Sequence, residues 1–344
     1  MIKRKKFNVL LSAFLVSVSL FSLIPYKIDA FIQEPSNTSQ NNSETSYLVE
    51  DNENYDTMPF KFRKSNELQS IANNSALNLA GLENLNISGS QQFSKMNLPL
   101  LLKAIDTNLP IIDFDLRQES HGFINGIPIS FENEHNNANK GLSNEQVLKK
   151  EKVQLDSIKK GVPISFHNHP NKTITPEEIF DEKTLVTSDN IKYMRIFATD
   201  EELPSVESID SFITIIKNLK EDSWLHFHCK EGIGRTTTFM IFYDMMKNYN
   251  NVSANDITNR QIELADFDSN DVHLLTSERR IALYDSFYNY CKKCGICSWI
   301  CPVNAIIEEE FGKPVVPDPE KCTGCLQCER MCPDFAISIK QINQ

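Results

Sequence analysis

Positive charge is in short supply in this sequence. Its 344 residues include 35 Lys and Arg against 46 Asp and Glu, which gives a formal net charge of −11 at pH 7. A protein this acidic is poorly suited to non-specific binding of nucleic acid, because it would repel the phosphate backbone. If the substrate is an anion, the positive charge that binds it must be concentrated in one pocket.

Cysteine is nearly absent from most of the chain. Cys229 stands alone in the first 290 residues, and the other eight of the nine cysteines lie between Cys291 and Cys332. The chain therefore divides into a cysteine-poor body, residues 58–290, and a cysteine-dense tail, residues 291–344. Hydrophobic residues make up 40% of the sequence, which excludes global disorder, and the length suggests two domains.

Long apolar runs are also missing, except for one near the N-terminus. Basic residues at positions 3–6 precede an apolar run that ends at Pro25, and Ala30 offers a small residue for cleavage. This pattern predicts a Sec-type signal peptide over residues 1–30 and a secreted or cell-envelope location, with an uncleaved membrane anchor as the alternative. Residues 31–57 contain no Lys or Arg and are rich in Asn and Ser, which predicts a polar linker without regular structure.

The body alternates between strand patterns and helix patterns. The expected strands are residues 110–115, 192–197 and 224–228, with a hairpin over residues 123–131 around Asn125-Gly126. The expected helices are residues 144–158, 204–219 and 235–247, the second of them opened by Pro204. The alternation predicts an α/β fold in which helices flank a central sheet.

The candidate chemistry lies where the last predicted strand meets its helix. The sequence there is His228-Cys229-Lys230-Glu231-Gly232-Ile233-Gly234-Arg235-Thr236-Thr237. A glycine-containing loop at a helix N-terminus can turn its backbone N–H groups inward and hold a phosphate. The candidate phosphate-binding residues are Lys230, Glu231, Gly232, Ile233 and Gly234.

Three side chains of this segment suggest nucleophilic catalysis. The helix N-terminus and nearby cations favour the thiolate form of Cys229, which could then attack phosphorus. Arg235 has a planar guanidinium that can bind two phosphoryl oxygens, and Thr236 could donate a hydrogen bond to the thiolate when it leaves. The alternative is that Cys229 is an ordinary buried thiol at a strand end.

A leaving alkoxide needs a proton donor on a separate loop. Asp200 follows a predicted strand and precedes the Pro204 helix, so it is the candidate general acid and later the base for the hydrolytic water. Glu201 and Glu202 are its nearest rivals.

The body resembles the protein-tyrosine-phosphatase-like inositol phosphatases, the cysteine phytases. The matching stretches are Asp115-Leu-Arg-Gln-Glu-Ser-His-Gly122, Arg195-Ile-Phe-Ala-Thr-Asp200 and Trp224 through Thr238. The resemblance implies a tyrosine-phosphatase-like fold and removal of phosphates from myo-inositol hexakisphosphate without a metal. It implies that Cys229, Arg235 and Asp200 are nucleophile, phosphate clamp and general acid. It also places Arg63 and Asp115 near the substrate.

The sequence departs from that family in the loop, where Lys230-Glu231 restores some positive charge through Lys230, and at two further places. Glu201-Glu202 stands where the family has His and then Trp-Pro, and residues 266–277 contain three aspartates where the family is usually rich in Lys and Tyr. Both departures add negative charge where a polyphosphate would bind. The sequence therefore predicts the phosphatase chemistry more firmly than the preference for the most phosphorylated inositol.

The tail contains two runs with the cysteine spacing of bacterial ferredoxins, each ending in Cys-Pro. Because the fourth cysteine of each run ligates the other cluster, two 4Fe-4S clusters are expected in a small α+β domain. The expected ligands are Cys291, Cys294, Cys297 and Cys332 for the first cluster, and Cys322, Cys325, Cys328 and Cys301 for the second. Zinc or a disulfide framework is the alternative. Such clusters are normally built in the cytosol, which conflicts with a signal peptide.

Two classes of function are therefore open. The first is a cysteine-dependent phosphatase of inositol phosphates with an appended iron–sulfur module, or a close variant acting on phosphotyrosine proteins or phosphoinositides. The second is an electron-transfer protein whose body only binds anions, its electron partner unidentified. The joint presence of Cys229, Arg235, Asp200 and Thr236 favours the enzyme, because a binding module needs no thiolate nucleophile.

Overall fold

A computed structural model describes residues 46–71, 77–219, 221–265, 267–293, 301–308, 314–325 and 328. The predicted signal peptide, residues 1–30, lies outside these residues. Among the residues that the structure describes, no helix combines the length and the apolar character needed to cross a bilayer.

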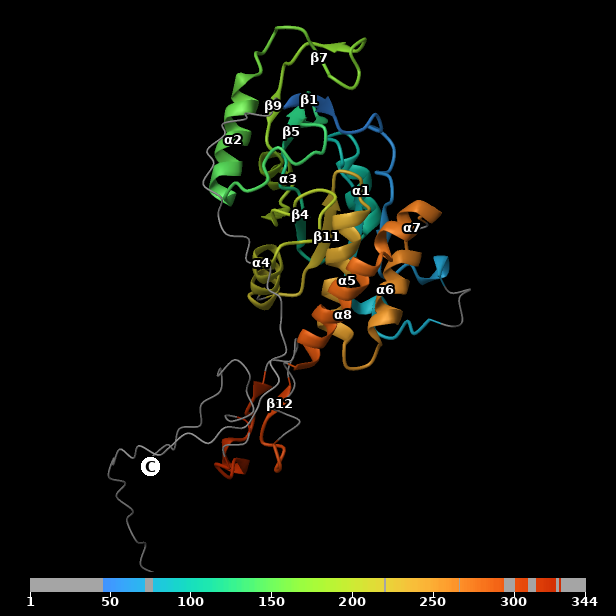
Figure 1. The fold of residues 1–344 in the computed structure, drawn as a ribbon, viewed down its shortest axis with the longest axis vertical. Coiled ribbons are helices and arrows are strands. Elements are labelled where there is room, and N and C mark those ends of the chain that lie inside the picture. Colours follow the sequence, from blue (N-terminus) through green and yellow to red (C-terminus); the bar gives the residue numbers. More distant parts are fainter. Residues whose placement is uncertain are drawn as a thin grey trace, which may run out of the picture. The chain divides into compact units, whose positions relative to one another are not determined.

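The body is built on a five-stranded sheet (Figure 1). Its strands, in spatial order, are β10 (Lys192–Arg195), β4 (Ile111–Asp115), β11 (Trp224–Cys229), β3 (Ile87–Gln91) and β2 (Arg63–Lys64). All neighbours run parallel except β2, which is antiparallel to β3. Strand β11 lies in the middle, so Cys229 at its end is flanked by the ends of β3 and β4. In parallel sheets, ligands commonly bind at this carboxyl edge.

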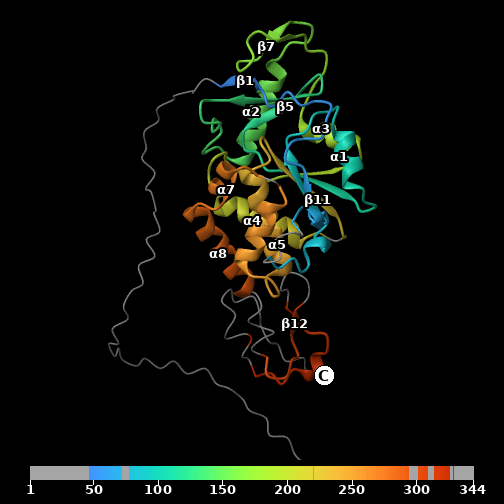
Figure 2. The same ribbon diagram turned by 90° about the vertical axis from the view of Figure 1, so that its right-hand side faces the viewer.

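Helices cover both faces of this sheet, as Figure 2 shows on either side of β11. One layer contains α4 (Val206–Lys217), α5 (Gly234–Asn248), α6 (Ala254–Glu263), α7 (Ser269–Leu275) and α8 (Glu278–Lys293). The other contains α1 (Leu98–Ile105) and α3 (Glu182–Ser188). Phe114 and Phe227 from the sheet pack against Phe212 and Phe239 in the first layer, whereas Trp224 packs among the side chains of the second. Burial on both faces explains the continuous apolar runs of the central strands.

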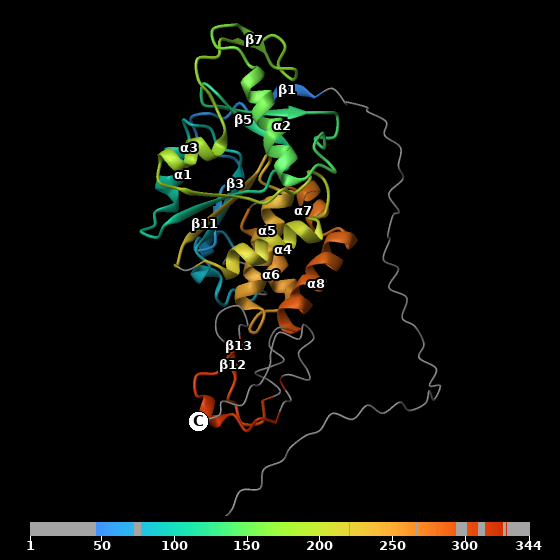
Figure 3. The same cartoon turned by 90° about the vertical axis from the view of Figure 1, so that its left-hand side faces the viewer.

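A second, antiparallel sheet lies beside α2 (Asn144–Ser157), as seen in Figure 3. Its strands, in spatial order, are β1 (Tyr47–Glu50), β6 (Ile127–Glu132), β5 (Ser120–Ile124) and β9 (Ile179–Phe180). Asn125 and Gly126 join β5 to β6 with positive φ angles of 52° and 82°, the conformation of a tight hairpin turn. Ser143 and Gln146 form a capping box that fixes the start of α2.

The remaining elements are short. They are 3₁₀ turns at Leu68–Ser70, Leu82–Asn84 and Pro319–Lys321, and the strand pairs β7 (Ile164–Ser165) with β8 (Thr173–Ile174) and β12 (Ile307–Glu308) with β13 (Pro314–Val315). The last pair and the 3₁₀ turn at Pro319–Lys321 belong to the tail.

The predicted strands, hairpin and helices of the body are confirmed, with two corrections. Pro204 does not open α4, because the side chain of Ser205 caps that helix by accepting the N–H of Ser208. The predicted linker, residues 31–57, is wrong from residue 47 onward, since β1 pairs with β6 and Asp51 is buried. The composition of this segment is polar, but residues from 47 onward are held by strand pairing and by a buried ion pair between Asp51 and Arg117. Composition alone does not reveal such contacts.

Candidate active site

The loop from Cys229 to Gly234 joins the end of β11 to the start of α5. Gly232 adopts a φ of 74°, and a Cβ built there would lie 2.4 Å from the backbone nitrogen of Gln91. Only glycine avoids both the left-handed strain and that clash. Glycine at this position therefore lets the loop pack closely against β3.

Arg63 holds this loop from behind. Its Nη1 donates to the carbonyl of Gly232 at 3.0 Å, and its Nη2 donates to Thr237 Oγ1 at 2.9 Å. The side chain is buried, and this burial lowers the pKa of its guanidinium to about 10. Arg63 thus supports the loop's backbone, and its position near the substrate stays a prediction.

The predicted nucleophile and its hydroxyl partner lie in contact. Cys229 is 2% exposed, and Thr236 Oγ1 donates a hydrogen bond to its Sγ at 3.2 Å. Thr236 occupies the first turn of α5, so the same helix start that faces a bound anion also presents the hydroxyl. This geometry suits stabilisation of a thiolate.

Arg235 is anchored by a carboxylate that the sequence reasoning missed. Glu119 accepts from Nη1 at 2.6 Å and from Nη2 at 3.1 Å. Burial alone would lower the pKa of the Arg235 guanidinium, but Glu119 and Asp200 outweigh it and raise that pKa. Arg235 is therefore a permanently charged group held in one orientation.

Glu119 is itself part of a buried network. Arg117 Nε donates to Glu119 at 2.8 Å, and Arg117 Nη1 donates to Asp51 at 2.7 Å and to Gln92 at 2.8 Å. Although burial alone would raise the pKa of Glu119, Arg235 and Arg117 lower it far below its usual range. In the sequence, the Arg-Gln-Glu part of the stretch from Asp115 to Gly122 places Arg117 and Glu119 close together. Only the fold shows that Glu119 contacts Arg235.

Asp200 contacts Arg235, whereas Glu201 and Glu202, the other candidates for the general acid, do not. Its Oδ1 is 3.0 Å from Arg235 Nη2, and its Oδ2 accepts from the side-chain amide of Asn136 at 2.7 Å. Glu201 is exposed in a left-handed turn with a φ of 58°, and Glu202 pairs with Lys140 at 2.5 Å. Of the three predicted candidates, Asp200 alone contacts Arg235.

Asp115 is buried among other polar side chains. It is completely buried, and its carboxylate lies 2.6 Å from the hydroxyl of Tyr193, 3.1 Å from Arg195 Nε and 3.2 Å from His121 Nε2. Burial tends to raise the pKa of Asp115, but the cations of His121 and Arg195 lower it on balance. Asp115 is a buried partner of these cations, and its position near the substrate stays a prediction.

Two clusters of carboxylates and histidines lie under the loop and have the composition of metal ligands. They are Asp113, Glu182 and His228, and Asp115, His121 and Glu182. Burial alone would lower the pKa of both histidines, but the carboxylates raise it, to about 9 for His121 and well above its usual value for His228. The histidines are already in contact with these carboxylates: His121 Nε2 lies 3.2 Å from Asp115 and 3.3 Å from Glu182, and His228 Nε2 lies 2.7 Å from Glu182.

The other loop residues differ in their surroundings. Gly234 begins α5, and Ile233 directly precedes it. The side chain of Glu231 is exposed. Lys230 pairs with Glu132 at 2.5 Å, so the positive charge that it was expected to lend the loop is already matched by a carboxylate.

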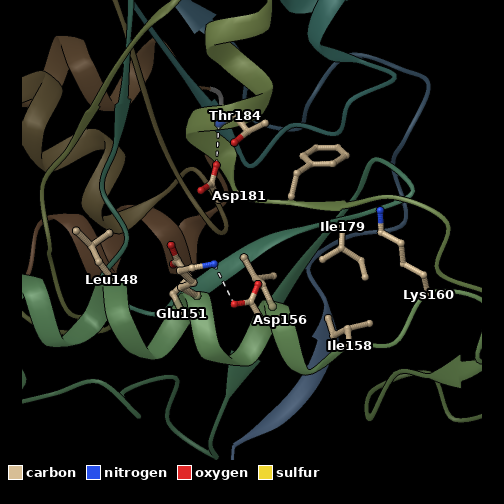
Figure 4. Close-up of a pocket in the computed structure, with 11 residues that line it drawn as sticks. Leu148, Glu151, Asp156, Ile158, Lys160, Ile179, Asp181 and Thr184 are labelled. Carbon is tan, nitrogen blue, oxygen red and sulfur yellow. Dashed lines mark hydrogen bonds and ion pairs between the residues drawn. The ribbon is translucent and has the colours of Figure 1, made fainter.

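A cleft of about 570 Å³ lies elsewhere, between α2 and the segment from β9 to α3 (Figure 4). Its walls are mixed, with Leu148 and Ile158 beside Lys152 and Asp156, which pair with each other at 2.9 Å. Its lining includes no residue of the Cys229 to Gly234 loop. The catalytic constellation therefore lies outside this cleft.

The described cysteines of the tail fit iron ligation. Cys301 Sγ accepts the N–H of Ala305 at 3.2 Å, and although burial alone would raise the pKa of its thiol, backbone N–H groups of the following turn lower it. A thiolate with N–H donors is the form that binds an iron–sulfur cluster. No disulfide joins Cys301, Cys322 and Cys325 to one another. Cys294, Cys297 and Cys332 lie outside the described residues.

Comparisons with known proteins find a matching family model and similar solved structures. The PTP-like phytase family model, described as inositol hexakisphosphate, matches residues 114–247. A PTP-like phytase structure from Bdellovibrio bacteriovorus is similar with 32% identity and a TM-score of 0.59, over 71% of this chain and 88% of that chain. A PTP-like myo-inositol phosphatase from Mitsuokella multacida, solved in complex with myo-inositol-(1,3,4,5)-tetrakisphosphate, has 26% identity and a TM-score of 0.64, over 72% of this chain and 45% of that chain.

Curated relatives match each part of the chain. Effector protein hopD2 of Pseudomonas syringae pv. tomato is 28% identical over 249 residues, 67% of this chain, and the chain spans about half of its length, 53%. A 4Fe-4S dicluster domain model matches residues 290–337. A ferredoxin-like protein in the nif region of Sinorhizobium fredii is 45% identical over 49 residues, which are 12% of this chain and 73% of that protein.

Proposed function

The chain belongs to the protein-tyrosine-phosphatase-like phytases and carries a 4Fe-4S ferredoxin domain, and we propose that it hydrolyses myo-inositol hexakisphosphate and lower inositol phosphates through a phosphocysteine intermediate. The observation that carries this proposal is the convergence of Cys229, Arg235 and Asp200 at one loop. The similar Mitsuokella multacida phosphatase was solved with an inositol tetrakisphosphate, which supports the substrate class.

In the first step, the loop amides and Arg235 bind the phosphoryl oxygens, and the thiolate of Cys229 attacks phosphorus. The S–P bond forms as the bond from phosphorus to the inositol oxygen breaks. Asp200 donates its proton to that oxygen, so inositol leaves as an alcohol. Glu119 keeps Arg235 in the orientation that the developing charge needs.

In the second step, Asp200 accepts a proton from a water that attacks the phosphocysteine. The P–O bond to water forms, the S–P bond breaks, and inorganic phosphate leaves. The hydroxyl of Thr236, 3.2 Å from Sγ, donates to the thiolate as it is released. No step requires a metal.

The contact between Asp200 and Arg235 places the proposed general acid next to the group that binds the phosphoryl oxygens. Arg235 Nη2 contacts both Glu119 and Asp200. A phosphoryl oxygen that binds Nη2 takes the place of the Asp200 carboxylate, which is then free to take up a proton and to face the leaving oxygen as a carboxylic acid. Asn136 keeps Asp200 at the edge of the site during this exchange.

Phosphate release from myo-inositol hexakisphosphate, an aryl phosphate and a phosphotyrosyl peptide tests the proposal. We expect inositol phosphates to be hydrolysed and Cys229→Ser to lower their turnover by at least about 10³-fold, because a serine hydroxyl is far less nucleophilic than a thiolate. Circular dichroism controls for folding. Turnover of the phosphotyrosyl peptide alone would favour a protein phosphatase, and undiminished turnover by Cys229→Ser would refute the cysteine mechanism.

We further propose that the tail binds two 4Fe-4S clusters. The proposed ligands are Cys291, Cys294, Cys297 and Cys332 for one, and Cys322, Cys325, Cys328 and Cys301 for the other. The hydrogen bond that Ala305 N–H donates to Cys301 Sγ supports this assignment. Such clusters, when bound, exchange single electrons. Anaerobically purified protein should contain about eight iron atoms per chain, and colourless protein without labile sulfide would contradict the proposal.

A further inference from the structure

The turn that follows β6, residues 133–142, is held together by its own asparagines. We call it the β6–α2 turn, because it leads into α2. Asn133 Nδ2 donates to Asn137 Oδ1 at 2.8 Å, and Asn133 Oδ1 accepts the backbone N–H of Asn137 at 2.8 Å. The backbone N–H of Asn136 donates to the carbonyl of Asn133 at 3.1 Å. These local bonds fix the backbone of Asn136.

The β6–α2 turn and the acid loop, which joins β10 to α4 and carries Asp200, both contact Gln118. Asn139 Nδ2 in the turn donates to the Gln118 carbonyl at 3.0 Å. In the acid loop, Thr199 Oγ1 donates to Gln118 Oε1 at 2.7 Å, and the carbonyl of Ala198 accepts the N–H of Gln118 at 3.2 Å. These contacts place the turn beside the acid loop without involving Asp200 itself.

Asn136 is the turn's contact with the proposed general acid. Its Nδ2 donates to Asp200 Oδ2 at 2.7 Å. The other oxygen, Oδ1, lies 3.0 Å from Arg235 Nη2 and accepts the backbone N–H of Glu201 at 3.1 Å. Glu201 is the next residue of the acid loop, so it moves with Asp200. Within the described part of the chain, Asn136 and Arg235 are therefore the two contacts that hold this carboxylate from outside its own loop.

The side chain of Asn136 is costly for the fold. Its Oδ1 is buried and has no hydrogen-bond partner among the described residues. An acceptor in that state has lost its water without gaining a protein donor. The backbone of Asn136 has a φ of 48°, a left-handed conformation that glycine adopts with less strain. Stability therefore does not explain this asparagine, whereas its bond to Asp200 points to a role in the reaction.

Phosphate binding changes how Asp200 is held. Under the proposed function, a phosphoryl oxygen takes the place of Asp200 on Arg235 Nη2. Asp200 then keeps the N–H of Glu201, in its own loop, and the amide of Asn136. A proton donor must lie within hydrogen-bond reach of the leaving oxygen, and a small misplacement is costly. The amide of Asn136 supplies this constraint after Arg235 has engaged the phosphate.

We infer that Asn136 is a further positioning residue, whose amide orients the Asp200 carboxyl for proton transfer to the leaving oxygen. The inference rests on the proposed function, because it concerns the general acid of that same site. It makes a specific demand on the kinetics. An ester depends on Asn136 only if its leaving oxygen needs a proton, because a weakly basic leaving group departs as an anion.

The test compares kcat/KM of the full-length protein for phenyl phosphate, whose leaving group needs a proton, and for dinitrophenyl phosphate, whose leaving group does not. Asn136→Gly removes the amide without straining the left-handed backbone, and Asn136→Asp keeps the shape but replaces the donor by an acceptor. Both variants should lower the ratio of phenyl to dinitrophenyl kcat/KM on the order of tenfold. Turnover of myo-inositol hexakisphosphate should fall in parallel with that of phenyl phosphate.

A double variant and a control make the result specific. Asn136→Gly should not change the ratio further when it is combined with Asp200→Asn, because the acid that it positions is then absent. Lys140→Met removes the other contact between the turn and the acid loop, the exposed pair with Glu202, and should leave the ratio unchanged. Urea unfolding shows whether each variant is folded.

Two results would overturn the inference while the proposed function stands. One is an equal loss for both aryl esters, which would indicate general damage to the site. The other is an unchanged ratio in folded Asn136→Gly. If the aryl esters are hydrolysed but no inositol phosphate is, the proposed function fails instead, and the aryl ratio still decides the role of Asn136.

Discussion

At the scale of single residues, the site depends on how one cation is held. Arg235 can bind two phosphoryl oxygens only if its guanidinium plane faces the loop, and Glu119 fixes that plane through two hydrogen bonds. Glu119 in turn is held by Arg117. Under the proposed function, Glu119 is therefore a positioning residue that acts on phosphate binding through Arg235.

Glu119→Gln should weaken both the site and the fold. It should lower kcat/KM by about 100-fold, because a small misplacement of a catalytic group is costly, and lower the free energy of unfolding by about 3 kcal/mol, because two buried cations lose a carboxylate. Steady-state kinetics and urea unfolding measure the two effects.

The inhibition constant for inorganic phosphate separates positioning from general damage. It should rise in folded Glu119→Gln, because Arg235 no longer presents both nitrogens. Glu202→Gln, which breaks the exposed pair with Lys140, should leave this constant and turnover unchanged. An unaltered phosphate constant in Glu119→Gln would contradict the positioning role.

At the scale of elements, the loop works because β11 delivers Cys229 to the point where α5 begins. Gly232 allows the loop to turn there without meeting β3, and Arg63 ties the loop to β2. The backbone N–H groups can face a phosphate only while these contacts hold. Loop conformation is therefore a separate requirement from the identity of the catalytic side chains.

Gly232→Ala should abolish most of the activity. The new methyl would lie 2.4 Å from Gln91 N, so the loop must shift, and turnover should fall by more than about 100-fold. Gly141→Ala is the matched control, because Gly141 has a φ of 81° but open space around it. The control should lose about 1 kcal/mol of stability and no turnover. Equal turnover in the two variants would show that the close approach is unimportant.

At the scale of the whole molecule, the two sheets are joined by buried charge. His121 on β5 contacts Asp115 on β4 at 3.2 Å and Glu182 on α3 at 3.3 Å. His228 on β11 contacts the same Glu182 at 2.7 Å. Removing any one charge would leave its partners buried and unmatched, so the body is expected to unfold cooperatively around this cluster.

The charge on His121 should make stability depend on pH. Although burial opposes the charged form, Asp115 raises the pKa of His121 from 6.5 to about 9. Its contribution, about 3 kcal/mol, is fully present below pH 6.5 and is lost as the pH rises through 9. The difference in unfolding free energy between wild type and His121→Gln, measured in urea from pH 6 to 10, should therefore shrink. A difference that does not change with pH would contradict the raised pKa.

Some features of the site could be predicted because they are local in the sequence. The strand, the glycines and the helix start that surround Cys229 lie within a few residues of it, and Thr236 follows in the first turn. Other contacts could not be predicted because the partners are far apart along the chain. Glu119 and Arg235 are separated by 116 residues, Asp51 and Arg117 by 66, and Gly232 and Arg63 by 169.

The sequence by itself determined the division between a one-cysteine body and an eight-cysteine tail, and it predicted the candidate nucleophile and the candidate phosphate loop. These depend on short spacings and on the intrinsic chemistry of thiols. Only the tertiary structure decided which carboxylates these cations contact. The pairs of Arg235 with Glu119, Lys61 with Asp271 and Lys230 with Glu132 form between distant parts of the chain, because folding brings their elements together.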